Sequence, residues 1–70
     1  MEIEWVHGFK ISIRIQSNNE VTISANKEGL LSLASQLKAL AEEEPGNHIH
    51  YDEHNSLETG SSGMIIEKVK

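Results

Sequence analysis

The chain lacks cysteine altogether, which excludes disulfide bonds and thiolate metal sites. It also lacks any apolar run near the roughly 20 residues that a membrane-spanning helix needs. Its first residues, MEIEW, have neither the basic region nor the apolar core of a secretory signal. Together these absences predict a soluble, cytoplasmic protein.

Basic residues are few: the chain has 6 Lys+Arg against 11 Asp+Glu, a formal net charge of -5. Proteins bind phosphate backbones by neutralising them with Lys and Arg, so this balance argues against nucleic acid and anionic membranes as partners. A basic protein is the natural complement, because opposite fields steer association. Considered alone, however, the charge favours a role in solubility over a basic partner.

With 70 residues, the chain has room for one domain, residues 1–70. FKISIRIQ (9–16) and EVTIS (20–24) alternate apolar and polar residues, which predicts two half-buried strands. The segment SNN (17–19) between them is typical of a turn, so these strands should form a hairpin. Ile3 and Trp5 keep the parity of the first strand, which favours one long strand from Ile3, kinked at Gly8, over a short separate strand before it.

The spacing of apolar residues changes to that of a helix between 26 and 46. Asn26 is a good N-cap, and Pro45-Gly46 stops the helix. Gly29 in the first turn favours a close approach of the helix to the sheet or to a partner, with fraying near the cap as the alternative. One apolar stripe is formed by Leu30, Leu33, Ala34, Leu37, Leu40 and Ala41.

Strand patterns return at 48–52 and 64–69, and the loop between them carries Leu57, which should fold back onto the core. The order β-β-α-β-β predicts an α+β domain with one amphipathic helix on a four-stranded, mostly antiparallel sheet. Its core should contain Leu33, Leu37, Leu40, Ile11, Ile13, Val21, Ile23 and Ile49.

The stretch GNHIHYDEHN (46–55) carries the most chemistry. Strand alternation places His48, His50 and Asp52 on the outward face. There they could form a three-ligand zinc site or, with greater weight, a solvated polar strand face or a surface that contacts a protein. No G-x-S-x-G elbow or oxyanion-forming glycine run accompanies any serine, so the sequence predicts no catalytic site. We therefore expect no metal, no cofactor and no enzyme activity.

Three carboxylates, Glu42, Glu43 and Glu44, lie at the negative end of the helix dipole, where each is unfavourable by roughly 0.3–1 kcal/mol. Local conflicts of this kind concentrate at functional sites. They form either an acidic patch for a basic partner or a frayed, solvated helix end.

Three segments together resemble a known family: the helix, the histidine strand and the closing strand. The matching positions are Gly29, Leu30, Leu33, Ala34, Leu37, Leu40 and Ala41; His48, His50, Asp52 and Glu53; and Ser61 or Ser62, Ile66 and Lys68. Over about residues 20 to 69, the chain resembles immunity protein family thirty-two of bacterial polymorphic toxin systems.

That resemblance implies a protein that binds and neutralises a cognate toxin of the same cell, such as a basic nuclease toxin. The residues expected to contact this partner are His48, His50, Asp52, Glu53, Glu42, Glu43 and Glu44. Two alternatives are a metal-dependent enzyme or metal-binding regulator, using His48, His50 and Asp52, and a homodimer formed through an open sheet face or edge strand.

Overall fold

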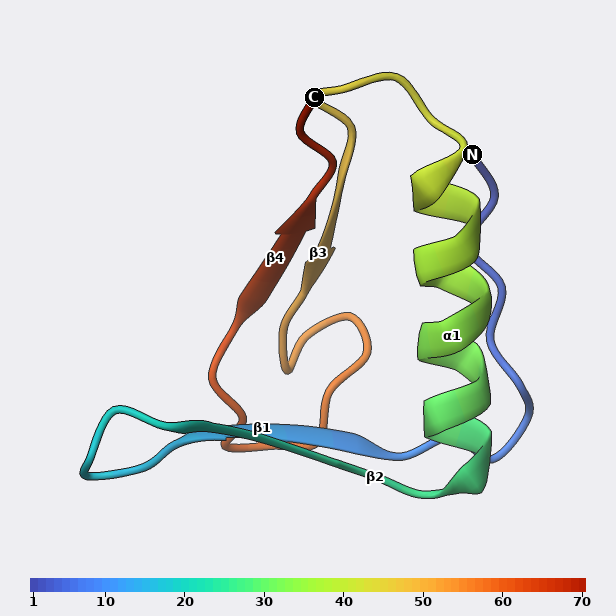
Figure 1. The fold of residues 1–70 in the computed structure, drawn as a ribbon. Helices are drawn as coiled ribbons and strands as arrows, with labels where there is room; N and C mark the ends of the chain where they lie inside the picture. Colours follow the sequence, from blue (N-terminus) through green and yellow to red (C-terminus); the bar gives the residue numbers. More distant parts are fainter.

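A computed structural model describes residues 1–70 (Figure 1). Its elements are β1 (Ile11–Ile15), β2 (Val21–Ala25), α1 (Lys27–Ala41), β3 (His48–Tyr51) and β4 (Met64–Glu67), which confirms the predicted β-β-α-β-β order. The helix is not long and apolar enough to cross a membrane.

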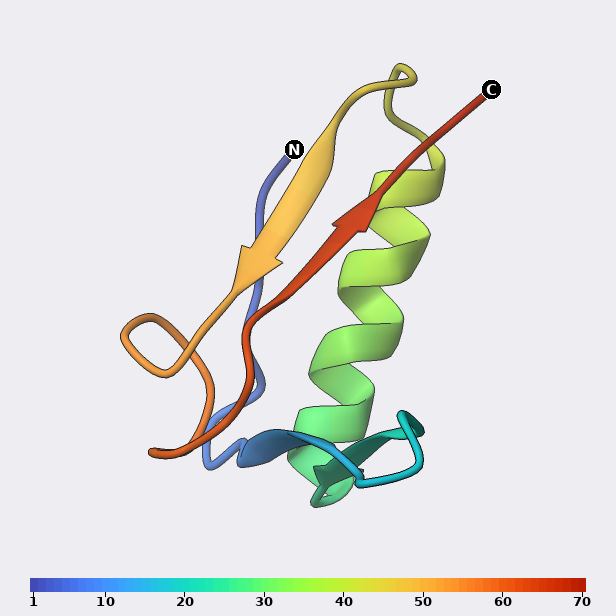
Figure 2. The same cartoon turned by 90° about the vertical axis from the view of Figure 1, so that its left-hand side faces the viewer.

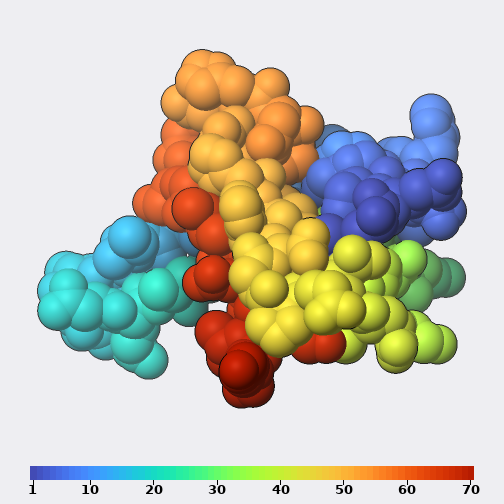
Figure 3. Space-filling view, turned by 90° about the horizontal axis from the view of Figure 1, so that it is seen from above, coloured from blue at the N-terminus to red at the C-terminus, as the bar shows by residue number.

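The expected hairpin is present: β1 and β2 pair antiparallel, with Ile13 opposite Ile23 and Ile15 opposite Val21. Asn19 in the connecting turn has φ 69°, a left-handed conformation that Asn tolerates better than most residues. The hairpin projects from the body of the molecule (Figure 3), so only the end of its apolar face nearest α1 reaches the core.

The expected four-stranded sheet is wrong, because the strands form two separate two-stranded sheets, β1-β2 and β3-β4. The second sheet is also antiparallel, with Ile49 opposite Ile66. A fourth strand cannot reach the outer edge of β1, because the loop before β4 occupies it. There Glu58 N donates to Ile11 O at 2.8 Å, and Ser62 N donates to Ile13 O at 2.8 Å.

The expected strand from Ile3 is also wrong, since residues 1–10 contain no strand. Gly8 has φ +88°, and the chain turns there, with Phe9 N donating to Val6 O at 3.1 Å. The segment before this turn runs along α1 instead of joining a sheet (Figure 2).

The start of α1 agrees with its sequence. Asn26 is the N-cap, and its side chain accepts a hydrogen bond from Gly29 N at 2.8 Å. A Cβ on Gly29 would lie 2.7 Å from Lys10 O and 2.9 Å from a side-chain carbon of Ile11. This glycine therefore allows the close approach of helix to sheet that its position predicts.

The helix buries a different face from the one expected. Leu33 and Leu40 are buried as predicted, but the other buried residues are Gly29, Ser32 and Gln36. Leu37 is 44% exposed, and the predicted core residues Val21 and Ile23 are 60% and 44% exposed. Ser32 and Gln36 replace leucines at the core because the N-terminal segment supplies their hydrogen-bond partners.

Those hydrogen bonds attach the N-terminal segment to α1. Ser32 Oγ accepts from Val6 N at 2.8 Å, and Gln36 Nε2 donates to Glu4 O at 2.8 Å. Satisfied polar groups cost far less to bury than orphaned ones. A segment distant in sequence thus decides which side of the helix faces inward.

The core lies between α1, β1 and β3. As predicted, it contains Ile11, Ile13, Leu33, Leu40, Ile49 and Leu57, and it also contains Tyr51. Trp5 and Phe9 pack against this cluster, with their ring centroids 4.3 Å apart and stacked. Trp5 also meets Tyr51 of β3 edge-on, with ring centroids 6.2 Å apart.

Candidate functional site

The histidine strand β3 alternates strictly between exposed and buried side chains. Ile49 and Tyr51 point inward, whereas His48 and His50 point to solvent, as the alternation predicts. The two imidazoles therefore share an outer sheet face and are not needed to fill the core.

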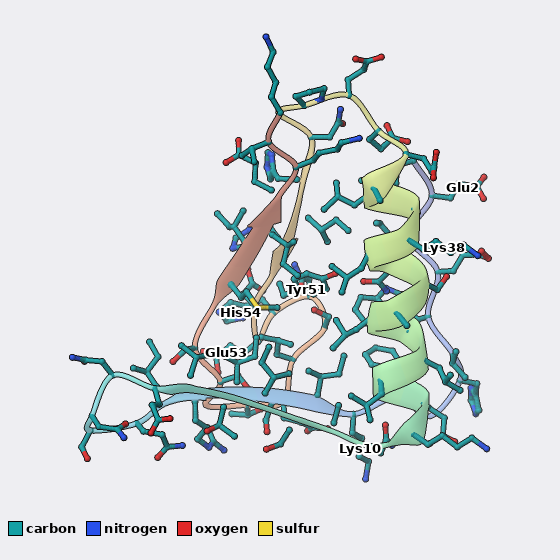
Figure 4. The ribbon with its side chains drawn as sticks, viewed as in Figure 1. Glu2, Lys10, Lys38, Tyr51, Glu53 and His54 are labelled. Atoms are coloured by element: carbon teal, nitrogen blue, oxygen red, sulfur yellow. The ribbon has the colours of Figure 1, made fainter.

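Tyr51 holds the strand in place from the inside. Its hydroxyl is buried between β3 and α1 (Figure 4) and donates to Gln36 Oε1 at 2.7 Å. Burial raises the pKa of the Tyr51 phenol, because the phenolate would lose its hydration. The relay from Tyr51 through Gln36 to the backbone of Glu4 joins β3, α1 and the N-terminal segment.

Beside β3 lies a hollow of about 310 Å³. Its lining combines the two histidines with apolar residues of β3 and the N-terminal segment: Ile3, Trp5, His48, Ile49, His50 and Asn55. Sequence reasoning missed the contribution of Ile3 and Trp5, because it assigned them to a sheet. Its hydrogen bonds to α1 show where the N-terminal segment lies, and no sequence pattern indicates them.

The edge of β3 that faces this hollow keeps unpaired backbone groups. Lys68 N donates to Asn47 O, which makes that pair a hydrogen-bonded one. By the alternation of antiparallel ladders, residues 48 and 50 then direct their N–H and C=O groups away from β4. The Asn55 side chain occupies one of these groups, donating to His50 O at 3.0 Å.

Asp52 and Glu53 organise the loop after β3. Asp52 Oδ1 accepts from His54 N at 2.8 Å, and its carbonyl accepts from Leu57 N at 2.9 Å. Glu53 Oε2 accepts from Gly60 N at 2.7 Å. Both carboxylates are partly exposed, so each is available to a partner while also bonding the backbone of its own loop.

The carboxylates at the end of α1 are partly balanced by nearby cations. Glu43 Oε2 lies 3.8 Å from the N-terminal amine of Met1. Lys68 Nζ donates to Ala41 O at 2.5 Å, which places positive charge at the negative end of the helix dipole. These contacts reduce the electrostatic conflict that the sequence indicates.

The structure therefore places the expected contact residues in two groups. Glu42, Glu43 and Glu44 precede β3, and Asp52 and Glu53 follow it. At about 3.3 Å per residue, β3 separates the two groups by more than 10 Å, with His48 and His50 exposed between them. The expected contact residues therefore do not form one cluster.

The candidate metal ligands do not converge. His50 Nε2 lies 3.7 Å from Asp52 Oδ2, but no three His, Asp or Glu side chains are grouped so that they could hold an ion. Of the three candidate metal ligands, only His50 and Asp52 lie close together, without a third ligand beside them.

Comparison with known protein families matches residues 20–69 to the family described as Immunity protein 32. Neither the curated proteins nor the solved structures gave a match. The matched range covers β2, α1, β3 and β4, including the histidine strand and the acidic helix end. The chain belongs to the Immunity protein 32 family.

Proposed function

We propose that this protein binds a cognate toxin of the same bacterium and neutralises it by occupying its surface, without catalysis and without a cofactor. Family membership over residues 20–69 is the observation that carries this proposal. A toxin is dangerous to the cell that makes it, so the immunity protein would act in the cytoplasm.

The binding surface that we propose is the histidine face, defined as the exposed side chains of His48, His50, Asp52 and Glu53 with the hollow beside them. It combines the two features that interfaces use. The hollow, with Trp5 at its lining, could accept an apolar or aromatic anchor of the toxin. The carboxylates around it would attract a basic toxin and speed its association.

Glu42, Glu43 and Glu44 extend this surface past the start of β3. Glu43 is partly buried against the N-terminal amine, so its charge is partly neutralised within the chain. Glu42 and Glu44 are exposed. We therefore assign them a long-range electrostatic role and assign direct contacts to the histidine face.

The experiment is survival of cells that express the toxin encoded next to this gene, together with wild-type or variant protein. Asp52→Asn and Glu53→Gln remove charge but keep the oxygen atoms that accept the loop hydrogen bonds. His48→Ala and His50→Ala remove exposed rings. A combined variant should lose protection and weaken binding by about 30-fold or more, as expected when groups worth 2 kcal/mol are removed.

Glu58→Gln is the matched control, because it removes one exposed charge from the same loop beside Ile11 rather than on the histidine face. It should protect like the wild type, and every variant should keep the wild-type melting temperature within a few degrees. Full protection by the combined variant would place the interface elsewhere. No protection by the wild type would remove the proposed function itself.

A further inference from the structure

The free edge of β2 offers a row of unpaired backbone groups. Gln16 N donates to Glu20 O, and Asn26 N donates to Lys10 O, so the even-numbered residues of this hairpin form its hydrogen-bonded pairs. Val21, Ile23 and Ala25 therefore direct their N–H and C=O groups away from β1. The corresponding groups of β1, at Ile11 and Ile13, are occupied by the loop before β4.

The sequence of this edge has none of the usual protection against strand pairing. Its residues, VTISA, include no charge, proline or glycine, and three of the five are β-branched. The free edge of β4, by contrast, carries Glu67 and is followed by Lys68 and Lys70. The free edges of β2 and β4 lie on the side of the molecule that faces the viewer in Figure 1, and of these two only the edge of β2 is uncharged.

Exposed apolar side chains gather next to β2. Ile15 and Val21 form a cross-strand pair near the tip of the hairpin and are 62% and 60% exposed. Leu30 and Leu37, which lie two turns apart on one line of α1, are 56% and 44% exposed.

We propose that two copies of this chain associate through β2, which pairs antiparallel with β2 of the second copy about a two-fold axis at Ile23. Ile23 then faces Ile23 of the second copy, and Val21 faces Ala25 of the second copy. The N–H and C=O groups that point to the free edge belong to Val21, Ile23 and Ala25. The register therefore pairs each of these residues with one residue of the second copy through two hydrogen bonds. The four-stranded sheet that one chain does not form arises between two chains.

The same register brings opposite charges together. Glu20 lies opposite Asn26 of the second copy, which precedes Lys27 at the start of α1, and the two-fold axis repeats this arrangement. Thr22 and Ser24 face each other on the polar side of the sheet. No like charges are placed opposite one another across the strand pair, and so the edge is complementary to itself.

The axis also places apolar surfaces against each other. The helix rises from one end of the hairpin, and the tip lies at the other end (Figure 1). A two-fold axis perpendicular to the hairpin puts the helix of the second copy above the tip. Leu30 and Leu37 of one copy then cover Ile15 and Val21 of the other. In the dimer, the exposed apolar residues of the hairpin and of the helix would therefore bury each other.

This interface lies away from the histidine face, because β3 is on the far side of β4 from the viewer in Figure 1. It stands or falls independently of the proposed function. The two associations should also respond to salt in opposite ways. Two chains of charge -5 repel each other, so salt should strengthen the dimer, whereas it should weaken binding of a basic toxin.

The test is sedimentation of the purified full chain over a concentration series. We expect a monomer–dimer equilibrium. Val21→Lys places a charge on the apolar side of the edge strand and should raise the dimer dissociation constant at least about tenfold. Ile65→Lys, the matched control, makes the same change from an exposed apolar residue to lysine on β4, outside this interface, and should change that constant less than about threefold. Thermal melts at low concentration would show that both variants fold.

Hydrogen exchange supplies a second readout. The amides of Val21 and Ile23 should become protected as concentration rises, whereas those of Ile65 and Glu67, on the free edge of β4, should exchange at an unchanged rate. A monomer at every concentration would overturn the proposal. So would a Val21→Lys dimer as tight as the wild type, equal loss in Ile65→Lys, or concentration-dependent protection at Ile65 instead of Ile23.

Discussion

One flank of α1 lies against the N-terminal segment and carries Ser32 and Gln36, whereas another carries Leu30 and Leu37 and is half exposed. Hydrophobicity alone would bury the second flank in preference to the first. The difference arises because Ser32 and Gln36 have hydrogen-bond partners in the N-terminal segment and in Tyr51. Helix orientation in this small domain is therefore set by polar contacts as well as by apolar area.

The largest expected effect separates leucines of the two flanks. Leu40 is 4% exposed and Leu30 is 56% exposed. Leu40→Ala should lower the free energy of unfolding by about 2–5 kcal/mol, the range for buried leucines. Leu30→Ala should lower it by less than about 1 kcal/mol. Urea unfolding at a concentration where the chain is monomeric measures both, and equal losses would contradict the burial of α1 described above.

The next effect concerns the point where α1 meets the hairpin. Gly29→Ala gains helix propensity but places a Cβ 2.7 Å from Lys10 O, a backbone atom that cannot move freely. Overpacking of this kind costs about 1–3 kcal/mol. Ala41→Gly, at the exposed end of the same helix, is the control for propensity. A Gly29→Ala variant more stable than the wild type would show that the close approach is absent.

A smaller effect depends on pH and tests whether the Tyr51 hydroxyl, which bonds Gln36 of α1, is buried. Burial raises the pKa of this phenol above its usual value of 10.0. The folded state then keeps its proton after the unfolded state has lost it, so the free energy of unfolding should fall as pH rises above 10. Below that pH the contribution is constant.

Tyr51 is the only tyrosine in the chain, so Tyr51→Phe is a direct control. It should remove this part of the alkaline dependence while lowering stability at every pH, because Gln36 Oε1 loses its donor. If the free energy of unfolding of Tyr51→Phe fell with pH above 10 as steeply as that of the wild type, groups other than Tyr51 would be responsible.

Local sequence patterns predicted the elements well. The alternation at 9–16 and 20–24, the cap at Asn26 and the histidine strand all reflect interactions within one element or one turn. The exposed positions of His48 and His50 followed from the same alternation. What the patterns could not supply was the pairing of elements distant in the chain.

Two errors have this origin. Four strand patterns allow one sheet, but the loop at Glu58 and Ser62 takes the edge of β1 through backbone groups that have no sequence signature. The helix stripe that includes Leu37 matches the 3.6-residue period, but Gln36 is buried through bonds to Glu4 and Tyr51. At the site, the hollow was missed for the same reason, since Ile3 and Trp5 reach it only along α1.

Exchanging the character of two adjacent residues tests the orientation of α1 most directly. Gln36→Leu makes a buried position apolar, and Leu37→Gln makes a half-exposed position polar. We predict that Gln36→Leu lowers the free energy of unfolding by about 1–3 kcal/mol, because the Tyr51 hydroxyl and the Glu4 carbonyl lose their partners. Leu37→Gln should lower it by less than about 1 kcal/mol in the monomer. If Gln36→Leu stabilised the protein and Leu37→Gln strongly destabilised it, the result would contradict this account and would indicate that the leucine flank is the buried one.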